Sequence, residues 1–399
     1  MKKIAVLGFG TVGSGTARML AERKDLLSRY TGEETALSYI LDVRDFPDSP
    51  FKDILVKDFS LIENDPEVTV VAEVIGGVKA AYEFTKRALQ KGKSVVTSNK
   101  ELVAEKGAEL LSLARENGCD YLFEAAVGGG IPVISPLVND LSHNAVSAVT
   151  GILNGTTNYI LTRMFASGAS FAEALAEAKA KGYAEADPSA DVEGTDACRK
   201  IAILTALAFG YAGPPAKIYT EGITGIQASD VEAAEKAGYA IKLLGKAEKT
   251  RQGDLFVLVA PFFVDKTNPL SHVSDVYNGI TVNGAFVGDV TFYGRGAGAD
   301  PTASAVVADI RKVLTGQAYR AAFTVNEDAL TDFSLFTCRR FIRVSGNPAA
   351  VGVVFGAVSP VPGEENAFLT PALSEKDYLY GKERLGSAGV TVVSHIRVL

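Results

Sequence analysis

Cysteine and histidine are scarce in this chain of 399 residues, which contains three of each. Cys119, Cys198 and Cys338 lie far apart and are odd in number, so neither a disulfide framework nor a cysteine-based zinc cluster is expected. The few histidines leave little material for a histidine-based metal site or a serine–histidine–aspartate triad. If the chain is an enzyme, carboxylates and lysines are expected to carry its polar chemistry.

A surplus of basic residues and long apolar runs are absent as well. The 40 lysines and arginines are outnumbered by 47 acidic residues, and the net charge of −7 argues against a nucleic-acid partner. No window reaches the roughly 20 apolar residues of a membrane helix, and the amino terminus shows no separate signal-peptide core. With 47% hydrophobic residues, we expect a globular protein of the cytoplasm without a membrane or nucleic-acid partner.

What the chain does have is a regular alternation of strands and helices over its first third. The predicted strands are apolar runs at 2–8, 36–43, 68–76, 94–98 and 120–128. The predicted helices are amphipathic runs at 12–29, 80–92 and 101–118. This alternation predicts an α/β fold with a Rossmann-type doubly wound parallel sheet.

The pattern changes after this region, which predicts three domains. Residues 1–130 are expected to form a nucleotide-binding domain, completed by a helix at 294–314. Residues 131–293, with longer helices and alternating strands, are expected to form an α+β substrate domain. The longer helices are predicted at 158–181 and 195–209. Residues 320–399 are expected to form a small separate α+β module, with the order strand, helix, strand, helix, strand.

The first motif is the glycine turn GFGTVG after the first strand. Gly8 allows a tight turn, Gly10 lets a pyrophosphate approach the backbone, and Gly13 lets the following helix pack closely on the strand. Unpaired N–H groups at the start of that helix favour an anion. Because the motif follows a strand and opens a helix, it predicts a dinucleotide site and not merely a structural turn.

Residues after two later strands extend this predicted site. Asp42 and Arg44 follow the second strand, where an acid favours the ribose hydroxyls of NAD and an arginine favours the 2′-phosphate of NADP. Since both are present, the choice of cofactor stays open, and Arg44 is equally well explained as a surface residue. Lys100 follows another strand at the sheet edge where ligands bind, and it can contact a phosphate, a carboxylate or a reacting oxygen.

A stretch rich in acids ends in a lysine. Asp196 and Lys200 are spaced i, i+4, so they lie on one face of a helix. That face continues through Ile203, Leu204 and Leu207, which predicts that the pair is buried. Buried charges are costly unless they pair with each other or serve a site. Acids beside a lysine suit a zwitterionic substrate with a reacting oxygen.

Two neighbouring features each allow two interpretations. The successive glycines of FEAAVGGGI (123–131) allow either close approach of the backbone to a ligand or a hinge between domains. Cys198 is either a thiol nucleophile or a small residue of the helix. No histidine is evident nearby to activate it, which favours the second interpretation.

Taken together and in order, these motifs resemble those of homoserine dehydrogenase. The resemblance covers about residues 1–314 and rests on GFGTVGSG (8–15), VVTSNKEL (95–102), FEAAVGGGIP (123–132), GILNGTTNYIL (151–161), GYAEADPSADVEGTDACRK (182–200) and FYGRGAGADPTASAV (292–306). It implies NAD- or NADP-dependent interconversion of L-homoserine and L-aspartate 4-semialdehyde in threonine and methionine biosynthesis. It also implies a homodimer or homotetramer, with the dimer contact in the 131–293 domain.

The resemblance also implies residue roles. Lys200 resembles the proton donor to the aldehyde oxygen, with Lys100 close to nicotinamide and substrate and Asp196 as a further acid of the catalytic site. Glu185 resembles the residue that binds the substrate's amino group. The other implied substrate contacts are Asp191, Tyr183 and Thr156. The implied cofactor contacts are Gly8, Gly10, Thr11, Val12, Gly13, Arg44, Thr97, Ser98, Lys100, Gly182 and Gly298.

Two further implications concern an ion and an effector. The backbone carbonyls of Glu124, Val127, Gly129 and Ile131 resemble a monovalent-cation site, usually for sodium, and hard cations prefer such oxygen donors. Many relatives end in an ACT module that senses threonine and has the order βαββαβ. Here SPVPGEE follows the first helix of the tail in place of a strand. The resemblance therefore implies a degenerate ACT-like module, with threonine as the effector to test.

Two other functions fit part of the pattern. One is another NAD(P)-dependent dehydrogenase of a four-carbon amino acid, such as an aspartate or aspartate-semialdehyde dehydrogenase, and the latter needs an activated cysteine. The other is a non-enzymatic sensor that binds a dinucleotide and an amino acid. Turnover with homoserine distinguishes the predicted function from both.

Overall fold

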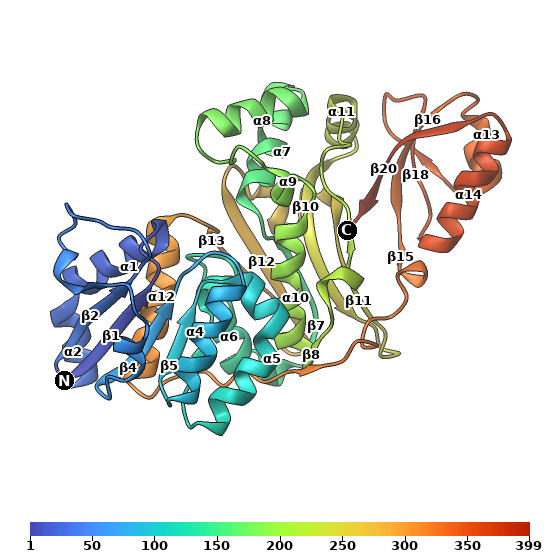
Figure 1. The fold of residues 1–399 in the computed structure, drawn as a ribbon. Coiled ribbons are helices and arrows are strands. Elements are labelled where there is room, and N and C mark those ends of the chain that lie inside the picture. The colour runs from blue at the N-terminus through green and yellow to red at the C-terminus, as the bar shows by residue number, and fades with distance from the viewer. The chain divides into compact units, whose positions relative to one another are not determined.

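The computed structural model describes all residues, 1–399, and contains two compact units (Figure 1). Unit 1 comprises Met1–Val146, Ala202–Pro215 and Gly294–Glu327. Unit 2 comprises Ser147–Ile201, Ala216–Tyr293 and Asp328–Leu399. None of the helices is long and apolar enough to cross a membrane.

Unit 1 is built on a parallel sheet of six strands in the order β3-β2-β1-β4-β5-β6. The strands are β1 (Lys2–Leu7), β2 (Thr35–Leu41), β3 (Leu55–Val56), β4 (Val68–Glu73), β5 (Ser94–Thr97) and β6 (Tyr121–Leu122). Their interiors are continuous buried apolar runs, as expected for a parallel sheet covered on both faces. The predicted Rossmann-type sheet is confirmed, and its strand order reverses between β1 and β4, where such sheets bind dinucleotides.

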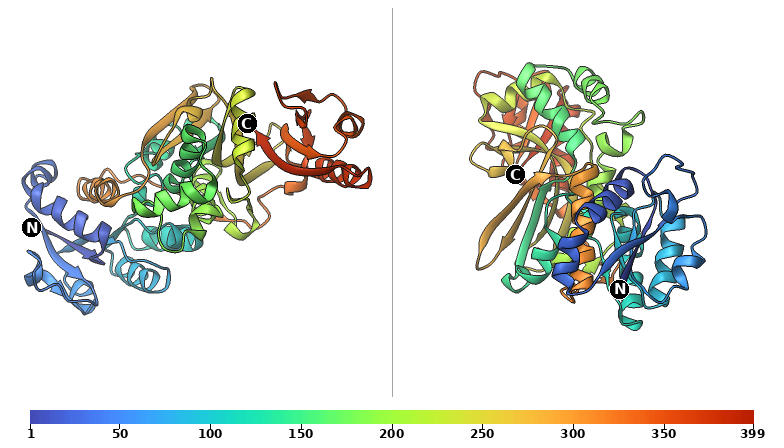
Figure 2. Two further views of the ribbon diagram at one scale, coloured as in Figure 1. Left: turned by 90° about the horizontal axis from the view of Figure 1, so that it is seen from above. Right: turned by 90° about the vertical axis from the view of Figure 1, so that its left-hand side faces the viewer.

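Helices cover this sheet. The longer ones are α1 (Thr11–Glu22), α2 (Lys24–Thr31), α4 (Lys79–Gln90), α5 (Lys100–Glu116) and α12 (Ala299–Leu314). Helix α12 packs beside α1, where a Cβ placed on Gly15 would lie 3.3 Å from the Ala303 Cβ (Figure 2). The short elements are α3 (Ser60–Glu63), α6 (Ile134–Asn139), η1 (Lys52–Ile54), η2 (Glu124–Ala126), η3 (Ser142–Asn144), β8 (Tyr211–Ala212) and β14 (Thr324–Val325).

Two predicted elements of unit 1 are wrong. The predicted helix 12–29 is two helices, because Arg23 leaves the helical conformation (φ −111°, ψ 16°) between α1 and α2. The predicted strand 120–128 ends at Leu122 and is followed by η2. The reason is that the next two N–H groups bond to side chains: Phe123 donates to the Tyr319 hydroxyl, and Glu124 donates to Asp309.

Unit 2 is built on a mixed sheet in the order β13-β12-β7-β10-β11-β20-β16-β18-β17, with β9 also paired to β11. The strands are β7 (Val146–Ile152), β9 (Tyr219–Thr220), β10 (Tyr239–Lys249), β11 (Leu255–Asp265), β12 (Tyr277–Gly284), β13 (Gly288–Arg295), β16 (Arg340–Ser345), β17 (Ser359–Pro360), β18 (Ala367–Leu369) and β20 (Thr391–Val398). A separate pair consists of β15 (Thr337–Cys338) and β19 (Leu373–Ser374).

The helices of this part of the chain are α7 (Gly155–Ser167), α8 (Phe171–Ala180), α9 (Ser189–Val192), α10 (Thr195–Phe209), α11 (Ala228–Lys236), α13 (Ala349–Phe355), α14 (Glu375–Ser387), η4 (Pro215–Lys217), η5 (Pro269–His272) and η6 (Phe333–Leu335). The predicted single helix 158–181 is wrong. It is interrupted at Gly168, which ends α7 in the left-handed conformation (φ 67°), and Ser170 then caps α8.

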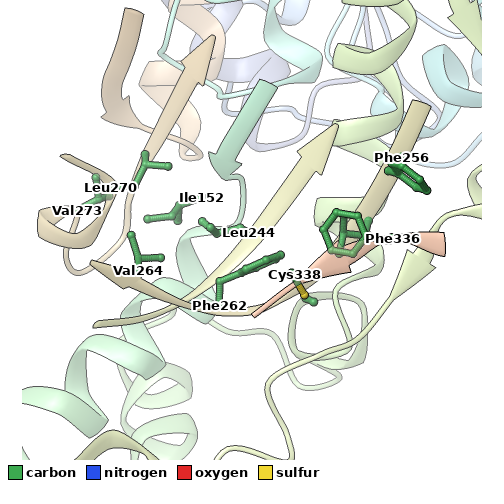
Figure 3. Packing of buried hydrophobic residues seen from close by; sticks show 11 residues of the cluster. Ile152, Leu244, Phe256, Phe262, Val264, Leu270, Val273, Phe336 and Cys338 are labelled. Atoms are coloured by element: carbon green, nitrogen blue, oxygen red, sulfur yellow. The ribbon is translucent and has the colours of Figure 1, made fainter. Parts of the chain in front are cut away.

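Strand β11 is buried along almost its whole length because both of its faces are covered. On one face, Phe262 and Val264 pack with Ile152, Leu244 and other apolar side chains (Figure 3). Successive side chains of a strand point to opposite faces. The other face carries Val259, whose Cγ1 lies 3.2 Å from a Cβ placed on Gly194. The sheet therefore supports the turn that precedes α10, the helix of Asp196 and Lys200.

The C-terminal module, defined here as residues 337–399, contributes four strands to the mixed sheet, one more than predicted. The two-residue β17 pairs antiparallel with β18, so the order from β16 to β20 is βαββαβ, apart from β19, which lies outside this sheet. The predicted order is wrong because Ser359–Pro360 is too short for an alternating pattern and contains a proline. Its sheet is also not separate, since β20 pairs with β11.

Candidate functional site

The glycine turn lies between β1 and α1, at the carboxyl edge of the parallel sheet. Gly8 has φ of +95°, and a Cβ placed on Gly13 would lie 1.9 Å from the Gly8 carbonyl oxygen. Only glycine fits at position 13. Gly10 is the N-cap of α1 and provides no side-chain cap. The N–H groups of Thr11 and Val12 therefore point out of the helix start, where an anion binds well.

Asp42 and Arg44 bond to each other at the end of β2. The Asp42 carboxylate accepts the Phe9 N–H at 2.7 Å and the Arg44 side chain at 3.0 Å (Nε) and 2.9 Å (Nη2). The Arg44 guanidinium holds the pKa of this carboxyl well below its usual range. Arg44 is nevertheless 59% exposed, and it lines a hollow of about 360 Å³ with Lys52 and Lys57.

A buried carboxyl supports the start of α5. Glu73, at the end of β4, accepts the Ile75 N–H at 2.7 Å and the Thr97 hydroxyl at 2.6 Å. Thr97 in turn accepts the Asn99 N–H at 2.9 Å, and Asn99 caps α5. Burial raises the pKa of Glu73 to about 7. This chain of bonds fixes Lys100, the first residue of α5.

Replacing Glu73 by glutamine is expected to stabilise the protein at pH 8 and to change little at pH 5. The folded pKa of about 7 lies above the ordinary value of 4.5. The folded state therefore loses stability as the pH rises through this window, by on the order of 3 kcal/mol once Glu73 is fully ionised. Glutamine keeps the shape and is neutral at every pH. Urea unfolding at the two pH values measures the difference.

The matched control is Glu109→Gln, which neutralises a carboxylate on α5 that is 47% exposed. Its effect is expected to stay below about 1 kcal/mol at both pH values, as for other exposed ion pairs. If Glu73→Gln and wild type are equally stable at pH 8, burial does not raise the pKa of Glu73.

The carboxylate of Glu124 caps a helix and is 2% exposed. It accepts the N–H groups of Val133 at 2.8 Å, Ile134 at 2.7 Å and Ser135 at 2.9 Å, at the start of α6. Lys312 of α12 lies 3.3 Å from the same carboxylate. The side chain is thus committed to the fold, and only the backbone carbonyl of Glu124 is left as an ion ligand.

The loop from Val127 to Ile131 contains the other predicted ion ligands. Gly129 has φ of +52°, and a Cβ there would lie 2.6 Å from the Gly296 carbonyl oxygen. The Ile131 N–H donates to the Gly128 carbonyl at 2.8 Å. No group of three His, Cys, Asp or Glu side chains could hold a metal ion. Backbone carbonyls in a tight glycine loop are oxygen donors of the kind that suits a hard monovalent cation.

The remaining predicted cofactor residues lie at the ends of elements. Gly298, with φ of +120°, is the N-cap of α12 in unit 1. Ser98 lies between β5 and α5. Gly182 lies in unit 2, in the turn after α8, with φ of +72°. Because parallel strands end at the same edge of a sheet, the structure brings the glycine turn and the segment from Thr97 to Lys100 to one edge.

In unit 2, four polar side chains form one network around Lys200. The Lys200 ammonium donates to the Leu153 carbonyl at 2.8 Å and to Asp196 Oδ2 at 2.7 Å. The Asn154 amide donates to Asp191 Oδ1 at 2.7 Å and to Asp196 Oδ2 at 2.9 Å. Lys200 is 8% exposed and Asp196 is 6% exposed. The predicted burial of the Asp196–Lys200 pair is observed.

Asn154 is the residue of this network that the sequence analysis missed. It is buried, and its side-chain oxygen caps α7 by accepting the Thr157 N–H at 2.9 Å. An asparagine directly before a helix is a common N-cap, which was the only signal in the sequence. Its amide group joins the two aspartates, and burial raises the pKa of Asp191, with the neighbouring Asp196 acting in the same direction.

The other predicted substrate residues are less buried. The Thr156 hydroxyl donates to the Tyr183 carbonyl at 2.7 Å, and the Tyr183 ring lies edge-on to Tyr159. Glu185 is exposed in the turn between α8 and α9. The structure therefore joins Thr156 to Tyr183 but does not bring Glu185 into the hydrogen-bond network of Lys200.

Comparison with known proteins relates both units to one family. The family described as "Homoserine dehydrogenase, NAD binding domain" matches residues 8–124, and the family described as "Homoserine dehydrogenase" matches residues 132–311. Homoserine dehydrogenase from Synechocystis sp. is 43% identical over 318 residues, which is 78% of this chain and 73% of that protein.

The chain belongs to the homoserine dehydrogenase family.

Solved homoserine dehydrogenases share the fold. The crystal structure from Thiobacillus denitrificans superposes with a TM-score of 0.88 at 32% identity, covering 100% of this chain and 98% of that one. A hyperthermophilic archaeal homoserine dehydrogenase mutant in complex with NADPH gives a TM-score of 0.68 at 30% identity, covering 80% of this chain and 99% of that one. The predicted activity, NAD(P)-dependent interconversion of L-homoserine and L-aspartate 4-semialdehyde, is thus confirmed at the level of the family.

The alternative functions are not favoured. Aspartate-semialdehyde dehydrogenase needs an activated thiol, whereas Cys198 is buried and burial raises the pKa of its thiol. A raised thiol pKa disfavours the thiolate that such chemistry requires. The environment of Cys198 therefore favours the interpretation of this residue as a small residue of the helix.

Proposed function

We propose that the Lys200 network binds homoserine and moves its hydroxyl proton. Asp191 binds the substrate ammonium with Glu185, and Thr156 and Tyr183 complete the pocket. Bound NAD(P) supplies the acceptor for the hydride that leaves the homoserine CH₂–OH carbon. In the same oxidation, the Lys200 amine takes the hydroxyl proton; in the reverse direction the ammonium returns it to the aldehyde oxygen. Lys100 contacts the nicotinamide and substrate.

The observation that carries this proposal is the geometry around Lys200. Its two hydrogen bonds, to Leu153 and Asp196, use two of the three N–H donors of an ammonium. The third remains for a substrate oxygen. Asp196 holds the ammonium in position, and Asn154 keeps Asp191 next to it. Positioning of this kind is a large part of catalysis.

Steady-state oxidation of L-homoserine by wild type and by variants of the network tests this proposal. Loss of turnover in a Lys200 variant that still binds NADPH supports it. Turnover near the wild-type rate in the same variant contradicts the role of Lys200, whether or not its affinity for NADPH changes.

We also propose that NADP is preferred over NAD. Asp42, the acid that favours NAD, already accepts four N–H groups from Phe9 and Arg44. Arg44 is exposed and borders a hollow with Lys52 and Lys57, and these three cations suit a 2′-phosphate. Asp45 also lines this hollow and pairs with Lys57 at 2.7 Å.

Arg44→Ala is expected to weaken NADPH binding by about tenfold to a hundredfold, in line with the 1.5–3 kcal/mol of a charged hydrogen bond. NADH binding is expected to change little. Titration of both cofactors by nicotinamide fluorescence measures the two dissociation constants. Arg29→Ala removes the same charge from the exposed side of α2 and is the matched control. An equal loss for NADPH and NADH would contradict the phosphate site.

Several further roles complete the proposal. The carbonyls of Glu124, Val127, Gly129 and Ile131 hold a sodium ion, and the C-terminal module binds threonine as an effector, in line with its βαββαβ order. Residues 1–130 with 294–314 bind the cofactor. Residues 131–293 bind the substrate and form the contact of a homodimer or homotetramer. Residues 320–399 form the ACT-like module. The three free cysteines suit the reducing cytoplasm as the place of action.

A further inference from the structure

A cluster built on two buried arginines joins the C-terminal module to the rest of unit 2. Arg397 of β20, 1% exposed, donates to Glu221 Oε2 at 2.6 Å and to Glu375 Oε1 at 2.9 Å. Arg340 of β16, fully buried, bonds the same Glu375. The cluster contains two cations and two anions, so its charge is balanced. Glu221 is the member that lies outside the C-terminal module.

Glu221 is held in place from several sides. Its backbone N–H donates to the Val259 carbonyl of β11 at 2.8 Å. Its carboxylate also accepts the Tyr219 hydroxyl at 2.9 Å. The Arg397 guanidinium lies over the Tyr219 ring, 4.7 Å from its centre, and Tyr219 stacks on Phe333 at 4.1 Å. Aromatic faces and a carboxylate together fix the direction of the Arg397–Glu221 bond.

The residue after Glu221 touches the turn of the substrate site. A Cβ placed on Gly222 would lie 2.1 Å from the Val192 carbonyl oxygen and 2.6 Å from the Glu193 Cα. The Ile223 N–H donates to the same Val192 carbonyl at 2.8 Å. Val192 ends α9, the short helix that contains Asp191. The two backbones are therefore in direct contact.

The residue before Glu221 touches the other end of this turn. A Cβ placed on Gly194, which has φ of +87°, would lie 3.1 Å from Thr220 Cγ2. The Gly194 carbonyl accepts the Cys198 N–H at 2.9 Å in the first turn of α10. The segment 220–223 thus contacts both ends of the turn 192–194, which separates Asp191 from Asp196.

We infer that the Arg397–Glu221 ion pair positions the acids of the substrate site, so that homoserine binding depends on the C-terminal module through this bond. Glu221 is a positioning residue, since it acts through Gly222 and the turn 192–194 and touches no member of the Lys200 network. The inference rests on the proposed roles of Asp191 and Lys200. Movement of β20 shifts segment 220–223, and this changes the distance between Asp191 and Lys200.

The test compares Glu221→Ala with Glu221→Gln in the full-length protein. Glu221→Ala is expected to raise the homoserine KM about tenfold, with the cofactor KM little changed. Its melting temperature is expected to fall, because the buried Arg397 loses one of its two carboxylate partners. Glu221→Gln keeps acceptors for Arg397 and Tyr219 and is expected to stay within about threefold of wild type. Glu364→Ala is the matched control. Glu364 also joins the C-terminal module to the rest of unit 2, through Lys236 of α11, and neither residue contacts the turn 192–194.

The outcomes separate this inference from its alternatives. An unchanged homoserine KM in folded Glu221→Ala overturns it, and so does an equal rise of both KM values in all three variants, which indicates a purely structural role. If Glu221→Ala does not fold, Arg397→Lys must show the same selective rise in homoserine KM. Turnover in Lys200→Ala would contradict the proposed function itself. If Lys200→Ala is inactive and Glu221→Ala has the same homoserine KM as Glu364→Ala, only the positioning role of Glu221 is contradicted.

Discussion

Replacing Lys200 by alanine is expected to lower kcat for homoserine oxidation by about a thousandfold, while the dissociation constant of NADPH stays within threefold of wild type. The magnitude follows from the usual contribution of a positioned general acid or base, roughly 10² to 10⁴. Lys200 is held by the buried Asp196 and by the Leu153 carbonyl, and its third N–H is the donor proposed for the substrate oxygen. Steady-state kinetics with fluorescence titration of the cofactor measures both quantities.

Lys200→Arg makes this prediction sharper. Arginine keeps the positive charge beside Asp196, and therefore the fold, but it does not release a proton at accessible pH. It is expected to be nearly as inactive as Lys200→Ala although its melting temperature is closer to wild type. Lys376→Ala, on the exposed side of α14, is the control for loss of a lysine. Substantial turnover in Lys200→Arg would show that charge, and not proton transfer, is the contribution of this residue.

Asn154→Ala is expected to lower kcat/KM for homoserine by about a hundredfold, mainly through KM. The Asn154 amide is the donor that Asp191 and Asp196 share, at 2.7 and 2.9 Å. Without it, the buried Asp196 and the half-buried Asp191 each lose a donor, and each lost charged hydrogen bond costs about 1.5–3 kcal/mol. The pKa of Asp191, already raised by burial, rises further, so the acid tends to bind a proton instead of the substrate ammonium.

Two variants separate the roles of Asn154. Asn154→Ser keeps an N-cap for α7 but cannot reach both aspartates, so it is expected to be stable and poorly active. Ser170→Ala removes the N-cap of α8, which is expected to lower the free energy of unfolding by about 1 kcal/mol. It leaves Asp191 and Asp196 unchanged, so its kinetics are expected to match wild type. Wild-type kcat/KM in Asn154→Ser would contradict the bridging role. Thermal unfolding alongside the kinetics distinguishes lost stability from lost function.

The sequence was sufficient wherever a local pattern determines the structure. Buried apolar strands between helices produce the parallel sheet, and the i, i+4 spacing places Asp196 and Lys200 on one buried helix face. The glycine turn was predictable for the same reason, since only glycine fits beside the Gly8 carbonyl at position 13. In each case the pattern that carries the prediction lies within a short run of consecutive residues.

The sequence was insufficient wherever the partner is distant in the chain. Asn154 bonds Asp196 across 42 positions, and its role is visible only once α7 and α10 are side by side. The carboxylate of Glu124 caps α6, although the sequence pointed only to its carbonyl. The ion pair of Glu221 with Arg397 spans 176 positions. Strand β17 has two residues, one of them proline, so no alternation could reveal it.

The most direct test of the account is the initial rate of NADP reduction by the purified protein with L-homoserine, measured beside the same assay with L-aspartate. The Lys200 network, with acids for an ammonium and a lysine for a hydroxyl, predicts a rate that saturates with homoserine and no rate with aspartate. Reduction of NADP by aspartate, or none by homoserine with NADP or NAD, would contradict it.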